Sequence, residues 1–375
     1  MDYDAHLIIA ASERDANLYY ATKFSAPDPF IFLQVRGQKL IVVSDLEIER
    51  AKAQARVDII LSLSAYEKQL EQEQGERPSL LQVLDAVLQE QHIQKILVPA
   101  DFRIEAADFL RERGYHVDWK QDPFYEERLR KSAEEVAQIA EVQRAAEAAM
   151  QEAETLLRTA EIHEGTLYLH GEPLTAEMVK KQIHITLLEH DCTARHTIVA
   201  GGDDACFPHN EGSGPLPADA PVVIDIFPQS NVTGYYADIT RTFVRGTPSP
   251  RVERMYEAVL AAQTLALERI KEGINGRDIH QAVSDLFVQY GFQSGNIEGT
   301  QQGFIHGTGH GVGLEIHEPP RISRTDHLLQ AGEVVTVEPG LYYLGAGGVR
   351  IEDLVVVTRD GCQNLTRYPK HLVLA

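Results

Sequence analysis

The chain has 375 residues, of which 43% are hydrophobic, and this composition excludes an intrinsically disordered protein. Asp and Glu total 56 against 35 Lys and Arg, so the formal net charge is -21. A surface of this sign repels phosphate groups, which argues against nucleic acid and anionic membranes as partners. The length is too great for one ordinary domain and predicts two.

The three cysteines and the start of the chain indicate where the protein resides. Cys192, Cys206 and Cys362 cannot form a complete disulfide framework and show no C-x-x-C spacing, so we expect a cytoplasmic protein. The segment from Met1 to Asp4 is acidic where a secretory leader is basic, and no apolar stretch approaches the ~20 residues of a membrane span. We therefore predict neither a leader nor a transmembrane segment.

The first third of the chain alternates patterns typical of strands and helices. Two apolar runs at 30–35 and 39–43 flank a turn that contains Gly37, and they predict a β-hairpin. We therefore predict a small α/β domain over residues 1–121, and no residue pattern in it indicates chemistry. The remaining predicted elements are strands at 59–63 and 96–98 and helices at 79–91 and 106–113.

The second predicted domain spans residues 122–375 and begins at the break marked by Asp122-Pro123. The segment 132–135 has the pattern of a capping box and predicts the start of a long helix. Strand-like runs gather after residue 195, so this domain is predicted to be α+β with much antiparallel sheet. Further helices are predicted at 176–189, 251–271 and 278–290.

Four strand-like runs in this domain carry acidic residues among apolar neighbours. Asp225 and Asp238 lie on two runs separated by turn formers, which predict a hairpin. Glu338 and Glu352 lie on two further runs that a glycine-rich turn joins. Each carboxylate taken singly could instead face solvent on a half-exposed strand. The apolar residues on both sides of Asp225 disfavour that alternative, so we expect two hairpins that each contribute two interior carboxylates.

The repulsion among such carboxylates predicts bound cations. At an effective dielectric constant of about 20, two carboxylates about 5 Å apart repel by roughly 3 kcal/mol, and six such pairs by about 20 kcal/mol. This repulsion exceeds a typical folding stability of about 5–15 kcal/mol. Protons or cations must therefore neutralise the cluster, and oxygen ligands suit hard divalent ions such as Mn²⁺.

Three histidines lie close together in the segment 306–318. Glycines alternate through its first half and disfavour a helix. From His310 onward the alternation predicts a continuing strand, with His310 and His317 on opposite faces. A single histidine on an apolar face is usually a core residue. Because His306, His310 and His317 fall within 12 residues, and beside a carboxylate set, we expect them to be functional.

These patterns together resemble the metal-dependent peptidases of the pita-bread fold, and within them the Xaa-Pro group of prolidase and aminopeptidase P. The first third resembles the N-terminal domain of the same group and of creatinase. The resemblance implies an α+β fold, in which a smaller α/β, ribonuclease-H-like domain precedes a pita-bread catalytic domain. The blocks that carry it are 224–225, 238–243, 306–318, and 336–340 with 350–353.

The resemblance implies hydrolysis of the peptide bond before proline, in Xaa-Pro dipeptides or at the N-termini of short proline-containing peptides. The implied nucleophile is a hydroxide that bridges two divalent metal ions, with Mn preferred and Co, Zn or Fe as alternatives. A homodimer is also implied. The metal ligands implied by the resemblance are Asp225, Asp238, His310, Glu338 and Glu352, of which Asp238 and Glu352 bridge both ions.

The same resemblance implies roles for further residues. His306, His317 and Glu338 are the implied catalytic residues, since the two histidines hold the substrate and assist proton movement and Glu338 shuttles a proton. His209 lines the implied substrate site. Arg350, which also belongs to that site, orients the ligand carboxylates.

Two features of the sequence leave the loop shape and the substrate preference open, though not metal binding. Phe227 stands where most of the family has glycine, and the stretch from Asp225 to Asp238 is longer than usual. Two alternatives to a metallopeptidase are a metal-free hydrolase on the same fold, as in creatinase, and a binding module without catalysis. The complete set of ligand-type residues disfavours both.

Overall fold

The structure is a computed structural model that describes residues 3–375 of the chain. Met1 and Asp2 lie outside the described residues. They belong to the acidic segment on which the prediction of no leader rests. The chain divides into two compact units between Arg128 and Leu129. The domain boundary expected after residue 121 stays a prediction, and the two units are described separately below.

The N-terminal unit is built on one six-stranded sheet. Its strands are β1 (Ala5–Ala10), β2 (Phe30–Val35), β3 (Gln38–Val43), β4 (Ile59–Ser62), β5 (Lys95–Pro99) and β6 (His116–Lys120). Its helices are α1 (Ala16–Thr22), α2 (Ile48–Gln54), α3 (Leu63–Gln74), α4 (Leu80–Glu90) and α5 (Ile104–Glu112), and a 3-10 turn follows at Glu126–Leu129. The strand order is β4-β3-β2-β1-β5-β6. The predicted hairpin is confirmed as the antiparallel pair β2–β3.

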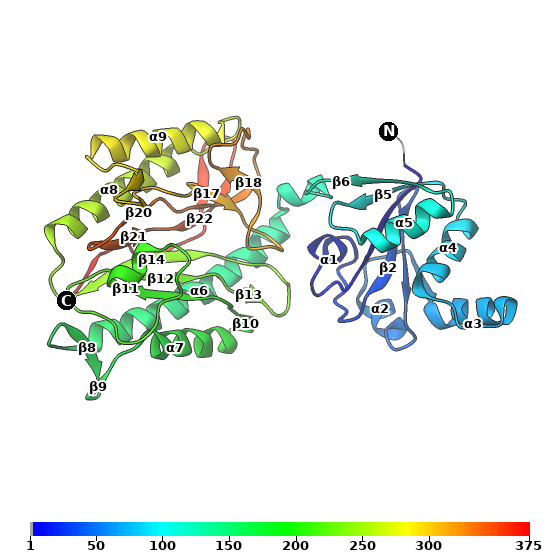
Figure 1. The fold of residues 1–375 in the computed structure, drawn as a ribbon, viewed down its shortest axis with the longest axis horizontal. Coiled ribbons are helices and arrows are strands. Elements are labelled where there is room, and N and C mark those ends of the chain that lie inside the picture. The colour runs from blue at the N-terminus through cyan, green and yellow to red at the C-terminus, as the bar shows by residue number, and fades with distance from the viewer. Residues whose placement is uncertain (1–2) are drawn as a thin grey trace. The chain divides into compact units, whose positions relative to one another are not determined.

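Both faces of this sheet are covered, so its strands read as continuous apolar runs. Along β2, Ile31 and Leu33 pack into a core with α3, α4 and α5. Phe30 and Phe32 point the other way, into a core with residues of α1 and α2. Figure 1 shows α1 and α2 on one side of this sheet and α3, α4 and α5 on the other. The predicted α/β character of this unit is confirmed.

The C-terminal unit contains four long helices and several antiparallel sheets (Figure 1). The helices are α6 (Ala133–Thr159), α7 (Ala176–Glu189), α8 (Pro250–Arg269) and α9 (Gly276–Gln289), with a 3-10 turn at Gly202–Cys206. The strands up to α9 are β7 (Glu161–His163), β8 (Thr166–Leu169), β9 (Glu172–Pro173), β10 (Cys192–Thr193), β11 (Ile198–Gly201), β12 (Val222–Ile226), β13 (Gln229–Ser230) and β14 (Ile239–Arg245). The later strands are β15 (Gly295–Ile297), β16 (Thr300–Gln302), β17 (Gly309–Gly311), β18 (Glu318–Ile322), β19 (Val334–Val337), β20 (Gly340–Tyr343), β21 (Gly347–Arg350), β22 (Asp353–Val357), β23 (Cys362–Asn364) and β24 (Val373–Leu374).

Local signals in the sequence set the ends of these helices. The Ser132 hydroxyl and the Glu135 side chain form the predicted capping box at the start of α6. Ser249 caps α8, and Pro250 takes its first position. Figure 1 shows α6 and α7 on one side of the strands and α8 and α9 on the other. This arrangement accords with the α+β, pita-bread architecture that the resemblance implied.

Two sheets lie between the helix pairs. One has the order β11-β12-β14-β24 and the other β18-β17-β19-β22-β23. The predicted pairing of the two Asp-bearing strands is confirmed, since β12 and β14 are antiparallel. The predicted Glu-bearing hairpin is confirmed in two parts, because β19 pairs with β22 and the glycine-rich turn joins β20 to β21.

The prediction that a strand continues beyond His310 is wrong. β17 ends at Gly311, and its pairing with β18 shifts register between His310 and Gly311. The chain then turns until Glu318, where β18 begins. The strand is interrupted although the sequence alternates. Gly311 lies against the backbone of Glu318 and Gly313 against its carboxylate, both closer than a side chain would permit.

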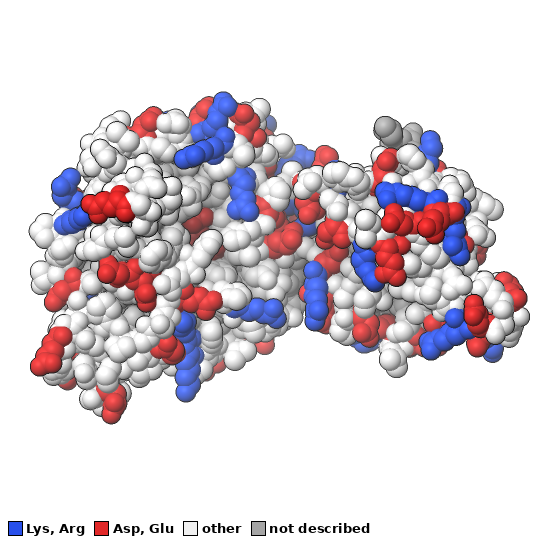
Figure 2. All heavy atoms as spheres, viewed as in Figure 1, with Lys and Arg blue, Asp and Glu red and all other residues white. Residues whose placement is uncertain are grey.

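Acidic side chains are spread over the face of the molecule drawn in Figure 2, and basic side chains are scattered among them. This distribution accords with the formal net charge of -21. The absence of a nucleic-acid partner stays a prediction. Among residues 3–375, none of the helices combines the length and the apolar character that crossing a membrane requires.

Candidate metal centre

Two strand pairs bring four carboxylates to one place in the C-terminal unit. Asp225 lies on β12, and Asp238 directly precedes β14, its antiparallel neighbour. Glu338 directly follows β19, and Glu352 directly precedes β22. Asp225, Asp238 and Glu352 are buried, and the side chain of Glu338 is 18% exposed. The registers of two sheets therefore fix the positions of these groups.

Hydrogen bonds join the two strand pairs. The Thr240 hydroxyl donates to Glu352 Oε2 over 2.7 Å, and the backbone N–H of Glu352 donates to the Thr240 carbonyl. Arg350 donates from Nε to the Thr240 hydroxyl over 3.2 Å and from a terminal nitrogen to Asp225 Oδ2 over 2.7 Å. Arg350 thus contacts Asp225 directly and is linked to Glu352 through the Thr240 hydroxyl.

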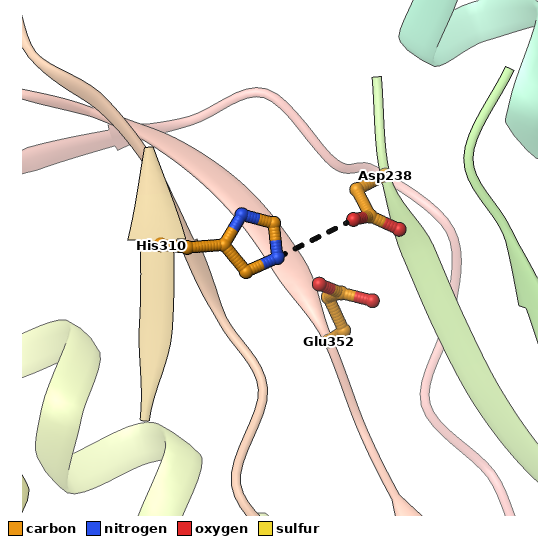
Figure 3. A group of neighbouring side chains, drawn as sticks. All are labelled: Asp238, His310 and Glu352. Carbon is orange, nitrogen blue, oxygen red and sulfur yellow. Dashed lines mark ion pairs between the residues drawn. The ribbon is translucent and has the colours of Figure 1, made fainter. Parts of the chain in front are cut away.

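His310, on β17, faces the carboxylates that the two strand pairs contribute. Its Nδ1 lies 3.2 Å from the Gly311 carbonyl, which can only accept a hydrogen bond, so Nδ1 carries the proton. The lone pair of Nε2 then points at Glu338 Oε1, 3.3 Å away, and at Asp238 Oδ2, 3.7 Å away. Figure 3 shows the imidazole directed at Asp238, with Glu352 beside it.

This arrangement contains acceptors that face one another. One ligand-type atom from each of Asp238, His310 and Glu352 lies within 4.8 Å of the other two. Among the described residues, nothing donates a hydrogen bond to Oδ1 of Asp225 or of Asp238, although both atoms are buried. Buried acceptors of this kind are normally satisfied. A bound cation would supply the missing partner, so the residues fit a divalent metal ion.

The acid–base properties of the cluster support the same conclusion. Burial, reinforced by the neighbouring carboxylates, raises the pKa of Asp238 and of Glu352 well above the ordinary range. Burial also raises the pKa of Glu338, to about 7. For His310, burial lowers the pKa to about 3, so the imidazole is neutral and its Nε2 is available as a ligand. The cluster therefore resists carrying its full negative charge unless a cation is bound.

His306 is held by contacts inside the protein. Its Nδ1 lies 2.7 Å from the Gly307 carbonyl and therefore carries the proton. Its Nε2 lies 2.8 Å from the Tyr342 hydroxyl, which also receives a hydrogen bond from Arg350 over 2.8 Å. The Tyr342 hydroxyl consequently donates to His306. Burial lowers the pKa of His306 to about 3, which agrees with a neutral ring.

His317 and His209 are the exposed histidines of this region. The ring of His317 meets that of His310 edge to face, with centroids 4.4 Å apart, so the opposite faces predicted for these two residues are wrong. Burial lowers the pKa of His317, and Arg321 and His209 lower it further. Among the described residues, none hydrogen-bonds to the ring of His317.

The structure brings most of the predicted site residues into the cluster and links the others to it only indirectly. Ion pairs and a ring contact join Asp225, Asp238, His310, Glu338, Arg350 and His317 to the cluster or to one another. Glu352 lies within 4.8 Å of Asp238 and His310, and His306 joins through Tyr342. His209 is related to it through electrostatic effects on His306 and His317. The roles of all nine residues stay predictions.

Thr240 and Tyr342 were missed by the sequence reasoning. Thr240 stands two residues after Asp238, and the period of a strand could have placed it near the cluster. Tyr342 lies on β20 beyond a break in the ladder, so no local period connects it with Glu338.

Comparison with known proteins agrees with this architecture. The profile of metallopeptidase family M24 matches residues 137–359, which is more than half of the sequence. The chain therefore belongs to metallopeptidase family M24. This membership confirms the resemblance to pita-bread metallopeptidases and implies that the buried Asp, His and Glu cluster serves a divalent metal.

Several relatives match about half of the chain. A Xaa-Pro dipeptidase of Pyrococcus furiosus is 41% identical over 179 residues, which cover 47% of this chain and 49% of that protein. In this and two further curated relatives the match spans about half of the relative's own length, 48% to 50%.

Solved structures match over nearly the whole chain. Prolidase from Pyrococcus furiosus has a TM-score of 0.79 and 26% identity, covering 98% of this chain and 97% of that one. X-Pro aminopeptidase from Thermotoga maritima has a TM-score of 0.82 and 25% identity, covering 99% and 97%. Both units of the chain therefore share the fold of prolidase-type proteins.

Proposed function

We propose that this chain is a metal-dependent exopeptidase that hydrolyses the peptide bond before proline. The observation that carries the proposal is the convergence of His310 Nε2 with the oxygens of Asp238, Glu338 and Glu352 in a buried site. Among the described residues, no donor reaches the buried Oδ1 atom of Asp238. Membership of family M24 and the names of the matched relatives support the same activity. The proposed substrates are Xaa-Pro dipeptides or the N-termini of short proline-containing peptides.

In this proposal the metal ligands are Asp225, Asp238, His310, Glu338 and Glu352, and they hold two divalent ions, Mn²⁺ by preference. Bound cations of this kind acidify a water molecule and polarise the carbonyl of the scissile bond. In the metal-free chain burial raises the pKa of Glu338 to about 7. A bound cation would lower this pKa and leave the carboxylate ionised, so that it can accept a proton.

The neighbouring side chains would bind and orient the peptide. His317 and His209 are exposed, so a peptide can reach their rings, and the neutral His317 can donate a hydrogen bond to the carbonyl oxygen under attack. His306 also belongs to the proposed substrate site. A substrate hydrogen bond to its Nε2 requires that the Tyr342 hydroxyl first release that atom.

A metal-removal experiment tests this proposal. The purified full chain is treated with a chelator, and hydrolysis of Ala-Pro is followed before and after Mn²⁺ or Co²⁺ is added. Activity should disappear with the chelator and return with the metal. Ala-Ala is the matched control, because a site specific for proline should cleave it far more slowly. Undiminished hydrolysis in the metal-free chain would instead support the creatinase-like alternative.

A second substrate pair separates the two exopeptidase types. A dipeptidase should prefer Ala-Pro, and an aminopeptidase should prefer the tripeptide Ala-Pro-Ala. If the chain binds Mn²⁺ but cleaves neither peptide, the binding-module alternative gains support. The same preparations, examined by analytical ultracentrifugation, test the proposed homodimer.

A further inference from the structure

A buried ion pair lies behind the histidines and takes no part in the proposed chemistry. Lys131 Nζ lies 2.5 Å from Glu318 Oε1, and the two side chains are only 2% and 4% exposed. Lys131 directly precedes the Ser132 cap of α6. Glu318 directly follows His317 and begins β18. The pair therefore joins the start of one helix to the end of the histidine segment, across 187 positions of sequence.

The Glu318 carboxylate supports the turn between His310 and His317. A Cβ atom added at Gly313 would overlap this carboxylate and lie 2.7 Å from its Cδ. A Cβ atom added at Gly311 would approach the Glu318 carbonyl to 2.7 Å. Gly311 is also the residue that pairs with Glu318 across β17 and β18. The chain between the two histidines is thus folded around Glu318.

The direction of the carboxylate is set by Lys131. A buried ion pair gives a fold little net stability, because removing two charges from water offsets most of their attraction. An apolar pair could fill the same volume. Apolar contacts are not directional, whereas a charge-assisted hydrogen bond is. Here the Lys131 ammonium group holds the Glu318 carboxylate against Gly313. Contacts on the opposite side hold the turn in place, since the Tyr236 N–H donates to the Gly313 carbonyl over 2.8 Å.

We propose that Lys131 and Glu318 are positioning residues, whose buried ion pair fixes the turn that sets the His317 ring against the His310 ring. The functional consequence rests on the proposed function, in which His310 binds metal and His317 contacts the peptide. A displacement of about 1 Å in such a group lowers turnover by about 100-fold.

The test separates positioning from stability with a double variant of the full chain. Lys131→Met and Glu318→Gln each remove one member of the ion pair and leave the other member buried, so each single variant should be less stable. The double variant carries no buried charge at this position, so its unfolding midpoint should return toward the wild-type value. If the pair positions the turn, kcat/KM for Ala-Pro should remain about 10–100-fold below wild type in the double variant.

A matched control lies on the same helix, remote in sequence from the histidine segment. Glu154 on α6 is buried and contacts Arg158, Tyr368 and His371. Glu154→Gln also removes a buried carboxylate from a network of partners. It should lower the unfolding midpoint and leave kcat/KM near the wild-type value.

Crystal structures of the wild type and the double variant decide the inference without reference to activity. The edge-to-face contact of His310 and His317, at 4.4 Å between centroids, should be lost in the double variant. If the contact persists, or if kcat/KM recovers together with stability, the inference is wrong. If the wild type cleaves no Xaa-Pro peptide, the proposed function fails, and the two ring positions still decide whether the pair positions the turn.

Discussion

The candidate metal centre has two halves that are built in different ways. In the carboxylate half, which comprises Asp225, Asp238, Glu338 and Glu352, each acid lies on or next to a strand paired over four or more residues. In the histidine half, the segment 306–318, the strand that carries His310 (Figure 3) has three residues and a register shift. Most of the segment lies outside any strand.

Different forces therefore hold the two halves. Backbone ladders and the bonds of Thr240 and Arg350 fix the carboxylates. Close approaches at glycine fix the histidine segment, since a Cβ atom at Gly309 would lie 2.8 Å from the Thr336 carbonyl carbon. The carboxylate half should consequently tolerate substitutions that keep the strand backbone. Substitutions that remove its polar side chains should impair it. The histidine half should be sensitive to added volume.

The largest expected effect comes from the carboxylate that is proposed to move a proton. Glu338→Gln keeps the shape of the side chain and removes its ability to accept a proton. We expect kcat to fall by about 10²–10⁴-fold, which is the usual contribution of a positioned acid–base group. The measurement is the steady-state hydrolysis of Ala-Pro in saturating Mn²⁺.

The control for this variant is Glu253→Gln, which changes an exposed glutamate in the first turn of α8. It should leave kcat unchanged. The fold of Glu338→Gln should remain intact by circular dichroism, because Gln removes a carboxylate whose pKa burial raises. Turnover near the wild-type rate would remove the proposed role of Glu338.

The same contrast explains which parts of the site could be predicted from the sequence. The two hairpins follow from local alternation and turn formers, so the four carboxylates could be assigned to neighbouring strands. The turn after Gly311 depends on packing against Glu318, whose partner Lys131 lies 187 positions away in sequence. No period in the segment 306–318 contains that information, and the alternation there predicted a strand instead.

A smaller effect is expected from the cation that orients the carboxylates. Arg350→Lys keeps the charge but loses the planar group that contacts Asp225, Thr240 and Tyr342 together. We expect kcat/KM to fall by about 10–100-fold, as for other groups that orient metal ligands. Arg277→Lys, in an exposed pair with Asp326, is the control and should be silent. Equal activity of the two variants would contradict the role given to Arg350.

In the histidine half, added volume should act on stability first. Gly313→Ala places a methyl group against the Glu318 carboxylate, so the turn must shift. We expect a loss of about 1–3 kcal/mol in the free energy of unfolding, as for other overpacked sites. Gly361→Ala is the matched control, because nothing lies within 4 Å of its added Cβ. It should change stability by less than about 0.5 kcal/mol. Urea denaturation of both variants measures the difference.

The last comparison distinguishes the two halves by the response of their stability to pH in the metal-free chain. The pKa of Glu338 is raised by burial from 4.5 to about 7, and that of Asp238 is raised by burial and by neighbouring carboxylates. The folded chain then holds protons that the unfolded chain has released. Stability from this half is therefore fully present below about pH 4.5 and is lost as the pH rises through about 7.

The histidine half has the opposite slope. Burial lowers the pKa of His310 from 6.5 to about 3, so below pH 6.5 the unfolded chain binds a proton that the folded chain does not. In the presence of chelator, Asp238→Asn should therefore stabilise the chain more at pH 7.5 than at pH 4.5. His310→Gln should stabilise it more at pH 5 than at pH 7.5, by roughly 2 kcal/mol, since one pKa unit corresponds to about 1.4 kcal/mol. Urea unfolding of both variants at each pH measures these differences. If the two variants change the free energy of unfolding in parallel across pH, the halves are not electrostatically distinct. If the two curves cross, the acid-sensitive and base-sensitive parts of the stability belong to separate segments of the chain.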